Sequence, residues 1–208
     1  MEAKYMADAE KIMKKKSFIK KEMDKHIPKQ QSDDLWRRAT VKLEELLETY
    51  KDIPKGVKGH TENYIFPSAS LYLIAKEEIG QEKAYEIVND AAVNMTSGVG
   101  KKLAAILRIP GMKDLFAKIW DPMTRRKFGP DNGFENVFYQ NQKNEFRMDI
   151  LCCPYVRYFT ELGCPELTKI YCANDERVYG DLPGIEFRRS GTLGTGAKCC
   201  DFYIRKKV

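Results

Sequence analysis

The chain of 208 residues has no long hydrophobic run: its longest uninterrupted apolar stretch is about five residues, Leu71 to Ala75. A membrane-spanning helix needs roughly 20 apolar residues and the core of a signal peptide at least about 7, so both are excluded. Hydrophobic residues make up 43% of the chain and charged residues 32%, which is typical of a folded soluble protein rather than a disordered one. We therefore expect a cytoplasmic protein with no membrane partner.

Histidine is scarce as well, because the chain contains two, His26 and His60. This excludes a multi-histidine metal site and makes a histidine-based catalytic triad implausible on composition alone. His26 falls in a lysine-rich segment and is expected at the solvent-exposed surface. His60 falls in a glycine-rich loop, where no function is expected for it.

Nucleotide-binding loops are also missing. Gly98-Val99-Gly100-Lys101-Lys102 looks like a phosphate loop, but Met95 and Lys102 stand where that motif needs Gly and Ser or Thr. Gly194-Thr195-Gly196 is expected to precede a strand, so it offers no helix N-terminus to a pyrophosphate. The sequence gives no sign of nucleotide binding.

The basic charge of the chain is confined to one segment. The net charge is +6, and residues 11–29 alone carry eight lysines against Glu22 and Asp24. Apolar residues recur among these lysines at roughly helical spacing: Met6, Ile12, Met13, Phe18, Ile19 and Met23. This pattern predicts a surface helix with one solvated lysine face and no nucleic-acid partner.

Hydrophobic periodicity and turn residues predict helices first and strands afterwards. Helices are expected at 32–52, 67–80, 81–96, 101–108, 112–120, 154–161 and 165–171, with the third one broken by Ser97-Gly98-Val99-Gly100. Strands are expected at 134–142, 145–152, 185–193 and 197–205, with turns around 141–144 and 194–196.

This order predicts an α+β fold, with a helical N-terminal two-thirds packed on a C-terminal antiparallel sheet in the order strand-strand-helix-strand-strand. We expect one domain over 1–208. It consists of a lysine-rich helical extension at 1–60, a helical part at 65–128 and an α/β part at 134–208 that carries the cysteines.

All six cysteines lie in the last 57 residues, at 152, 153, 164, 172, 199 and 200. Disulfides are not expected in a reducing cytosol. The adjacent pairs Cys152-Cys153 and Cys199-Cys200 fit strands, whose neighbouring side chains face opposite sides of the sheet.

If Cys153, Cys172 and Cys200 converge, three interpretations are open. One is a thiolate nucleophile with a carboxylate beside it to move protons. Another is a zinc or iron ion held by the three sulfurs and an aspartate, although the sequence has no CxxC spacing. The third is that the cysteines are small core residues.

A string of motifs in the second half of the chain adds to these interpretations. It comprises Gly133-Phe134, Cys153-Pro154-Tyr155, Glu161-Leu162-Gly163, Pro165-Glu166-Leu167, Cys172, Asp175, Pro183-Gly184-Ile185, Phe187, Arg189, Thr192-Leu193, Gly196 and Cys200-Asp201-Phe202. In these motifs the chain resembles the L-2-amino-thiazoline-4-carboxylic acid hydrolase family. The resemblance covers roughly residues 65–206, and the lysine-rich N-terminal segment lies outside it.

The resemblance implies hydrolytic opening of a small cyclic isothiourea, with L-2-amino-thiazoline-4-carboxylate giving N-carbamoyl-L-cysteine. No cofactor is implied, and a homo-oligomer is left open. The competing function class is a non-catalytic, sensor-like domain whose cysteine-lined pocket binds a small sulfur compound or a metal.

Candidate roles follow from this resemblance. A thiolate at Cys172 or Cys200 would attack the ring carbon, or Asp175 or Asp201 would activate water directly. Arg189 would hold the substrate carboxylate. The expected catalytic residues are Cys172, Cys200 and Asp175, and the expected substrate-binding residues are Arg189, Cys153, Tyr155 and Asp201. The remaining cysteines are interpreted as structural.

Overall fold

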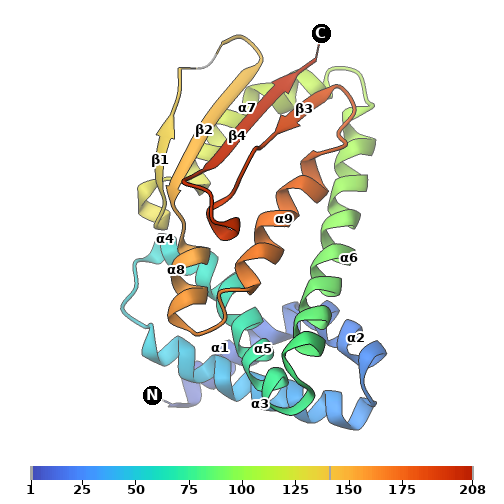
Figure 1. Ribbon diagram of the computed structural model, residues 1–208, viewed down its shortest axis with the longest axis vertical. Helices are drawn as coiled ribbons and strands as arrows, with labels where there is room; N and C mark the ends of the chain where they lie inside the picture. Colours follow the sequence, from blue (N-terminus) through green and yellow to red (C-terminus); the bar gives the residue numbers. More distant parts are fainter. Residues whose placement is uncertain (1, 141, 208) are drawn as a thin grey trace. The chain divides into compact units, whose positions relative to one another are not determined.

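The computed structural model describes residues 2–140 and 142–207 (Figure 1). The chain divides into two compact units: the chain up to Ala92 with Tyr158–Leu167, and Val93–Arg157 with the chain from Thr168 onward. The division falls inside a helix, α6 (Gln81–Leu107). No linker composition marks it, which is why the sequence predicts a single domain.

The first unit is helical. Its elements are α1 (Glu2–Lys15), α2 (Ser17–His26), α3 (Lys29–Thr49), α4 (Lys55–His60), a π-helical turn (Thr61–Ile65), α5 (Phe66–Ile79) and the first part of α6. Helix α3 starts directly after Pro28, three residues before the predicted start. The backbone is extended at Pro28 itself, whose φ is fixed by its ring, so the helix begins at the next residue. The apolar stripe of α3 is buried as its periodicity predicts: Leu35, Ala39, Leu43, Leu46 and Leu47.

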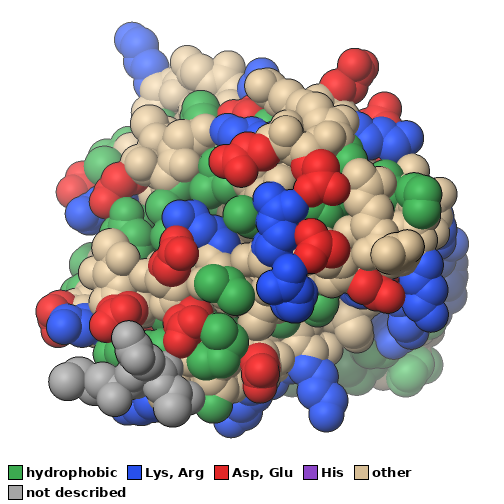
Figure 2. Space-filling view, turned by 90° about the horizontal axis from the view of Figure 1, so that it is seen from below, with side chains coloured by type: hydrophobic (Ala, Val, Ile, Leu, Met, Phe, Trp, Pro, Cys, Tyr) green, Lys and Arg blue, Asp and Glu red, His purple; other side chains and the backbone are tan. Residues whose placement is uncertain are grey.

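The prediction of one solvated lysine face is correct for part of the N-terminal segment. Lys14, Lys15 and Lys21 are exposed, and the face drawn in Figure 2 shows basic side chains interspersed with acidic ones. The prediction is wrong for Lys16 and Lys20. Burial lowers the pKa of Lys16, and the Lys20 side chain, 16% exposed, lies between two aspartates.

The second unit contains the sheet. Its elements are the rest of α6, α7 (Met112–Lys127), a 3-10 turn (Pro130–Asn132), β1 (Glu135–Phe138), β2 (Glu145–Cys152), the start of α8 (Pro154–Glu161), α9 (Leu167–Tyr179), β3 (Ile185–Arg188), a second 3-10 turn η3 (Leu193–Thr195) and β4 (Cys200–Lys206). The strand order is β1-β2-β4-β3, and every neighbouring pair is antiparallel. The predicted α+β fold is therefore confirmed. Asn141, part of the predicted first turn, lies outside the described residues.

The strand register separates the two faces of the sheet. Phe146 pairs with Ile204 and Ile150 with Cys200, and these residues face the core. The core of this unit is formed by residues of the strands, of α6 and α7 and of two connecting segments: Leu107, Phe116, Trp120, Phe134, Phe146, Met148, Ile150, Leu182, Ile185, Phe187, Cys200 and Ile204. The opposite face carries the alternate, more polar residues of the strands, as expected for an antiparallel sheet with one buried side.

Two sequence-based predictions about this unit are wrong. Helix α6 is not broken at Ser97–Gly100: a Cβ on Gly100 would lie 2.9 Å from the carbonyl oxygen of Arg177, so this glycine allows α9 to approach α6 closely rather than ending the helix. Strands β3 and β4 pair as predicted, but residues 189–199, which include the η3 turn, join them instead of a tight hairpin.

None of the helices among the described residues has the length and apolar content needed to cross a bilayer.

Candidate active site

Helix α9 carries two of the predicted catalytic residues, Cys172 and Asp175. The sequence predicts a helix end at Tyr171, but α9 continues to Tyr179, so Asp175 is helical. Residues three apart on a helix lie on the same side. Because Asp175 lies one turn from Cys172, the thiol and the carboxyl are presented on the same face of the helix.

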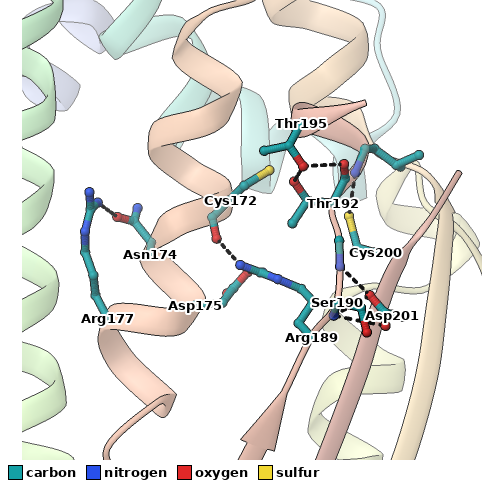
Figure 3. A network of polar contacts seen from close by, with 12 residues as sticks. Cys172, Asn174, Asp175, Arg177, Arg189, Ser190, Thr192, Thr195, Cys200 and Asp201 are labelled. Atoms are coloured by element: carbon teal, nitrogen blue, oxygen red, sulfur yellow. Dashed lines mark hydrogen bonds and ion pairs between the residues drawn. The ribbon is translucent and has the colours of Figure 1, made fainter. Parts of the chain in front are cut away.

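Arg189, directly after β3, joins the strand to this face of α9. Its Nη1 donates a hydrogen bond to Asp175 Oδ2 at 2.8 Å, and its Nη2 donates one to the carbonyl oxygen of Cys172 at 2.7 Å (Figure 3). The Arg189 side chain is 8% exposed. Its guanidinium lies 5.3 Å and 5.7 Å from the ring centroids of Phe202 and Phe187. The arginine therefore fixes the position of the carboxyl and of the helix turn that carries the thiol.

The Asp175 carboxyl has an unusual electrostatic environment. Burial raises the pKa of Asp175 to about 6, although the charge and the hydrogen bonds of Arg189 oppose this change. The Asp175 side chain remains 32% exposed. A carboxyl that titrates near neutral pH and is still accessible can both accept and return a proton during a reaction.

The η3 turn brings Cys200 next to this face of α9. A Cβ on Gly194 would lie 2.7 Å from Cys172 Sγ and 2.7 Å from Thr168 Cγ2, so the turn packs directly on the thiol of α9. The backbone N–H of Leu193 donates to Cys200 Sγ at 3.2 Å. The two sulfurs thus approach the same turn from opposite sides, as Figure 3 shows.

The two thiols differ in accessibility. Cys200 is 6% exposed, and burial raises its pKa to about 11 despite the hydrogen bond from Leu193. Cys172 is half-buried. A thiolate is the nucleophilic form, and burial disfavours it at Cys200. Cys172 is more exposed, so it is the better placed of the two to react with a molecule from solution.

Cys153 lies at the start of α8, immediately before Pro154. Burial raises the pKa of Cys153 to about 12, opposed by hydrogen bonds from the backbone N–H groups of Val156 and Tyr155 to its sulfur. A residue that accepts such bonds in front of a helix is an N-cap. The ring centroid of Tyr155 lies 5.0 Å from that of Tyr171. The two hydrogen bonds to its sulfur give Cys153 a structural role. The substrate-binding roles of Cys153 and Tyr155 stay predictions.

Asp201 lies on the other face of the sheet. It pairs with Asp149, whereas Cys200 pairs with the buried Ile150, so Cys200 and Asp201 face opposite sides of the sheet. The Asp201 carboxylate accepts backbone hydrogen bonds from Ser190 and Gly191, both at 2.9 Å. Burial raises the pKa of Asp201, but hydrogen bonds from the Ser190 side chain and from these backbone N–H groups lower it below its ordinary value overall. Its hydrogen bonds hold the segment that follows β3, and no hydrogen bond or ion pair of the described residues joins Asp201 to Cys172.

Comparison with known proteins adds the decisive observation. The family model for L-2-amino-thiazoline-4-carboxylic acid hydrolase matches residues 58–204, a span that includes every candidate residue described above. The chain belongs to this family of hydrolases. No curated protein and no solved structure gave a significant match.

The family match starts at residue 58, so α1, α2 and α3 lie outside the matched span. Cys164 lies in the other compact unit from Cys172 and is buried. Cys152 is exposed at the end of β2. Neither is part of the described cluster.

The sequence predicts no cofactor and leaves a zinc or iron ion on three thiols as an alternative. Among the described residues, one group of potential ligands has its atoms within 4.8 Å of one another, and it consists of Glu22, His26 and Asp90. Cys153, Cys172 and Cys200 do not form such a group. The expectation that the protein needs no cofactor stays a prediction, and a metal on the thiols stays the alternative to it.

A cavity of about 320 Å³ lies at the opposite end of the strands. Its lining includes Trp120 of α7, Glu145 at the start of β2 and Lys206 at the end of β4. It contains none of the candidate catalytic residues, which gather where β2 ends and β4 begins.

Sequence reasoning missed Gly194 as a contact of the thiol. The sequence offered it as a turn residue between two strands, and its packing on α9 depends on a contact between distant segments. The glycine spacing of the turn was visible, but nothing in it points to Cys172.

Proposed function

We propose that this protein hydrolyses L-2-amino-thiazoline-4-carboxylate, or a closely related cyclic isothiourea, to N-carbamoyl-L-cysteine. The family match supports the reaction class. The observation that carries the assignment of the site is the placement of Cys172 and Asp175 on one face of α9, with Arg189 donating hydrogen bonds to the Asp175 carboxylate and to the backbone carbonyl of Cys172. We expect no cofactor for this reaction.

The substrate sets the chemical requirements. Its C2 carbon is bonded to the ring sulfur, a ring nitrogen and an exocyclic nitrogen, and hydrolysis must add water there and cleave the C2–S bond. This requires a nucleophile, a group that moves protons and a partner for the substrate carboxylate. Cys172, Asp175 and Arg189 can fill these roles in that order.

In the first step, the Asp175 carboxylate takes the proton of the Cys172 thiol, and the thiolate attacks C2. The C2–S bond of the ring then breaks, and its electron pair goes to the ring sulfur. That sulfur takes the proton held by Asp175 and becomes a free thiol. The enzyme now carries an isothiourea on Cys172 that contains one whole substrate molecule.

In the second step, Asp175 takes a proton from a water molecule whose oxygen attacks the same carbon. The bond from this carbon to Cys172 Sγ breaks, Asp175 returns its proton to the sulfur, and the proton left on the attacking oxygen moves to the former ring nitrogen. The product leaves as N-carbamoyl-L-cysteine, so one water is consumed and the thiol and the carboxyl are regenerated. A carboxyl with a pKa of about 6 suits both proton transfers near neutral pH.

Two features favour Cys172 over Cys200 as the nucleophile. Cys200 is buried in the core of the second unit and its pKa is raised to about 11. Cys172 is more accessible and lies one helical turn from the carboxyl. We assign Cys200 the task of holding the η3 turn against Cys172 through its bond with Leu193.

Two roles are proposed for Arg189: it positions the catalytic groups, and it binds the substrate carboxylate. Its bonds with Asp175 and the carbonyl of Cys172 position the catalytic groups. A guanidinium carries five N–H donors, so further donors remain for the carboxylate of the substrate.

Product analysis tests this proposal. Purified protein is incubated with L-2-amino-thiazoline-4-carboxylate, and the mixture is analysed by mass spectrometry. We expect N-carbamoyl-L-cysteine and, after acid quenching, a peptide containing Cys172 that is heavier by one substrate molecule. Absence of the product contradicts the proposed function. Product formation with the adduct mapped to Cys200 contradicts the assignment of the nucleophile.

A further inference from the structure

Three potential metal ligands meet in the first unit, far in sequence from the cysteines. Glu22 and His26 lie one turn apart on α2, and Asp90 lies on α6. One ligand atom from each lies within 4.8 Å of the other two. The sequence predicts a solvent-exposed His26, and this is wrong: the side chain is 17% exposed and its ring faces the two carboxylates.

From this geometry, we propose that Glu22, His26 and Asp90 form a binding site for a divalent zinc-like cation. His26 Nε2 lies 3.2 Å from Asp90 Oδ2 and 3.8 Å from Glu22 Oε1. Bonds of about 2.0–2.1 Å from a tetrahedral zinc ion place neighbouring ligand atoms about 3.3 Å apart. The three atoms therefore need only small movements to bind one ion.

The set of donor atoms determines the class of ion. One imidazole nitrogen and two carboxylate oxygens suit Zn²⁺, whereas Ca²⁺ and Mg²⁺ prefer oxygen ligands alone. Three protein ligands leave a fourth position for water. Asp90 is partly exposed, so an ion can enter the site from solution.

One neighbouring cation competes with the ion. Lys25 Nζ contacts Glu22 Oε2 at 2.7 Å, and its charge opposes binding of a second cation. Glu22 Oε1, the oxygen nearer to His26, faces the proposed site. Without an ion, the same cluster would be a histidine in contact with two carboxylates, which is the alternative that the experiment must distinguish.

The position of the site indicates its role. Helix α2 precedes the part of the chain that matches the hydrolase family, whereas Asp90 lies within that part. A bound ion would connect α2 to α6 within the first unit. Because a ligand that binds the folded state alone stabilises it by mass action, zinc should raise the melting temperature of the protein.

The test is calorimetric titration of metal-free full-length protein with ZnCl₂ at neutral pH, together with the absorption spectrum of the Co²⁺-loaded protein. We expect one tightly bound ion per chain, and a Co²⁺ spectrum without the sulfur charge-transfer band that thiolate ligands produce. The spectrum separates this site from the six cysteines.

Three variants complete the experiment. His26→Gln and Asp90→Asn should each weaken zinc binding by at least roughly 10–100-fold, the range seen when even outer ligand partners are removed. His60→Gln removes the other histidine and should bind as wild type, and Lys25→Gln should bind more tightly. Circular dichroism checks that each variant is folded before zinc is added.

The proposal is overturned if folded His26→Gln binds zinc like the wild type, or if the wild type binds no zinc at this site. The cluster is then a contact between one histidine and two carboxylates that holds no zinc ion. These outcomes are read from metal binding alone, so they are independent of hydrolytic activity.

Discussion

Replacing Gly100 by alanine should push α6 and α9 apart, whereas the same change at Gly98 should not. Both glycines lie in α6, two residues apart. A Cβ at Gly100 would lie 2.9 Å from the carbonyl oxygen of Arg177 and 3.5 Å from Val178 Cα. At Gly98 it would meet nothing within 4 Å. The contact at Gly100 is with backbone, which cannot rotate away as a side chain can.

The magnitude follows from comparing the two variants. Alanine is favoured over glycine in a helix interior by about 1 kcal/mol, so Gly98→Ala should raise the free energy of unfolding by about that amount. Gly100→Ala gains the same preference but incurs an overpacking cost of about 1–3 kcal/mol. The helix preference cancels in the comparison, and Gly100→Ala should be the less stable variant by about 1–3 kcal/mol.

Urea unfolding monitored by circular dichroism measures this difference, and melting curves provide a second reading at roughly 2–4 °C per kcal/mol for a chain of this length. Because α9 also carries Cys172 and Asp175, Gly100→Ala should lower the rate of hydrolysis while Gly98→Ala leaves it unchanged. Equal stability of the two variants would refute the argument that Gly100 is required for the close approach of the helices.

Two further predictions concern charged residues. The pKa of Asp175 is raised to about 6, so the hydrolysis rate should increase as the pH rises through about 6 and then level off, and a flat pH–rate profile of the wild type contradicts its role as proton acceptor. Because this pKa lies above its ordinary value of 3.8, the folded state binds the proton more tightly, and the contribution of Asp175 to the free energy of unfolding should fall as the pH rises from 3.8 to about 6. Lys20→Gln removes contacts with Asp24 and Asp33 at 2.6 Å and 2.7 Å and should lower the free energy of unfolding by about 1 kcal/mol. The exposed control Lys21→Gln should change it by less than about 0.5 kcal/mol, and equal effects in the two variants would contradict the ion-pair assignment.

Elements whose signals are local could be predicted from the sequence. The predicted bounds of α8, from Pro154 to Glu161, agree with the structure, because a proline marks its start and a Leu-Gly pair follows its end. The second strand was also predicted at its observed bounds, Glu145–Cys152. In both elements, turn residues and periodicity along the chain carry the information.

Contacts between distant segments limited the other predictions. Gly100 was interpreted as a helix break, and the contact with α9 that explains it is seventy-seven residues away in the chain. The predicted helix ended before Asp175, whereas the observed helix continues past it, because Ala173 and Asn174 give no clear stop signal. The candidate residues of the site were named from the sequence, but their arrangement depends on the η3 turn, whose packing no local pattern indicates.

The cluster of Glu22, His26 and Asp90 was missed for a similar reason. The first two residues have i,i+4 spacing, which places them on one helix face, and that signal was available in the sequence. Their partner lies on α6, and only the tertiary structure brings it within reach.

The central claim is that Cys172 performs the reaction of this hydrolase family, and the initial rate of thiol release from L-2-amino-thiazoline-4-carboxylate tests it most directly. Wild type, Cys172→Ser and the control Cys199→Ser are compared at equal concentration after their folding has been verified. Serine preserves the size of the side chain but is hardly ionised at neutral pH, so the loss of a thiolate nucleophile should lower the rate by several orders of magnitude. We predict that Cys172→Ser loses turnover while Cys199→Ser keeps a rate close to that of the wild type. Turnover by folded Cys172→Ser at the wild-type rate, or no turnover by the wild type, would contradict the account.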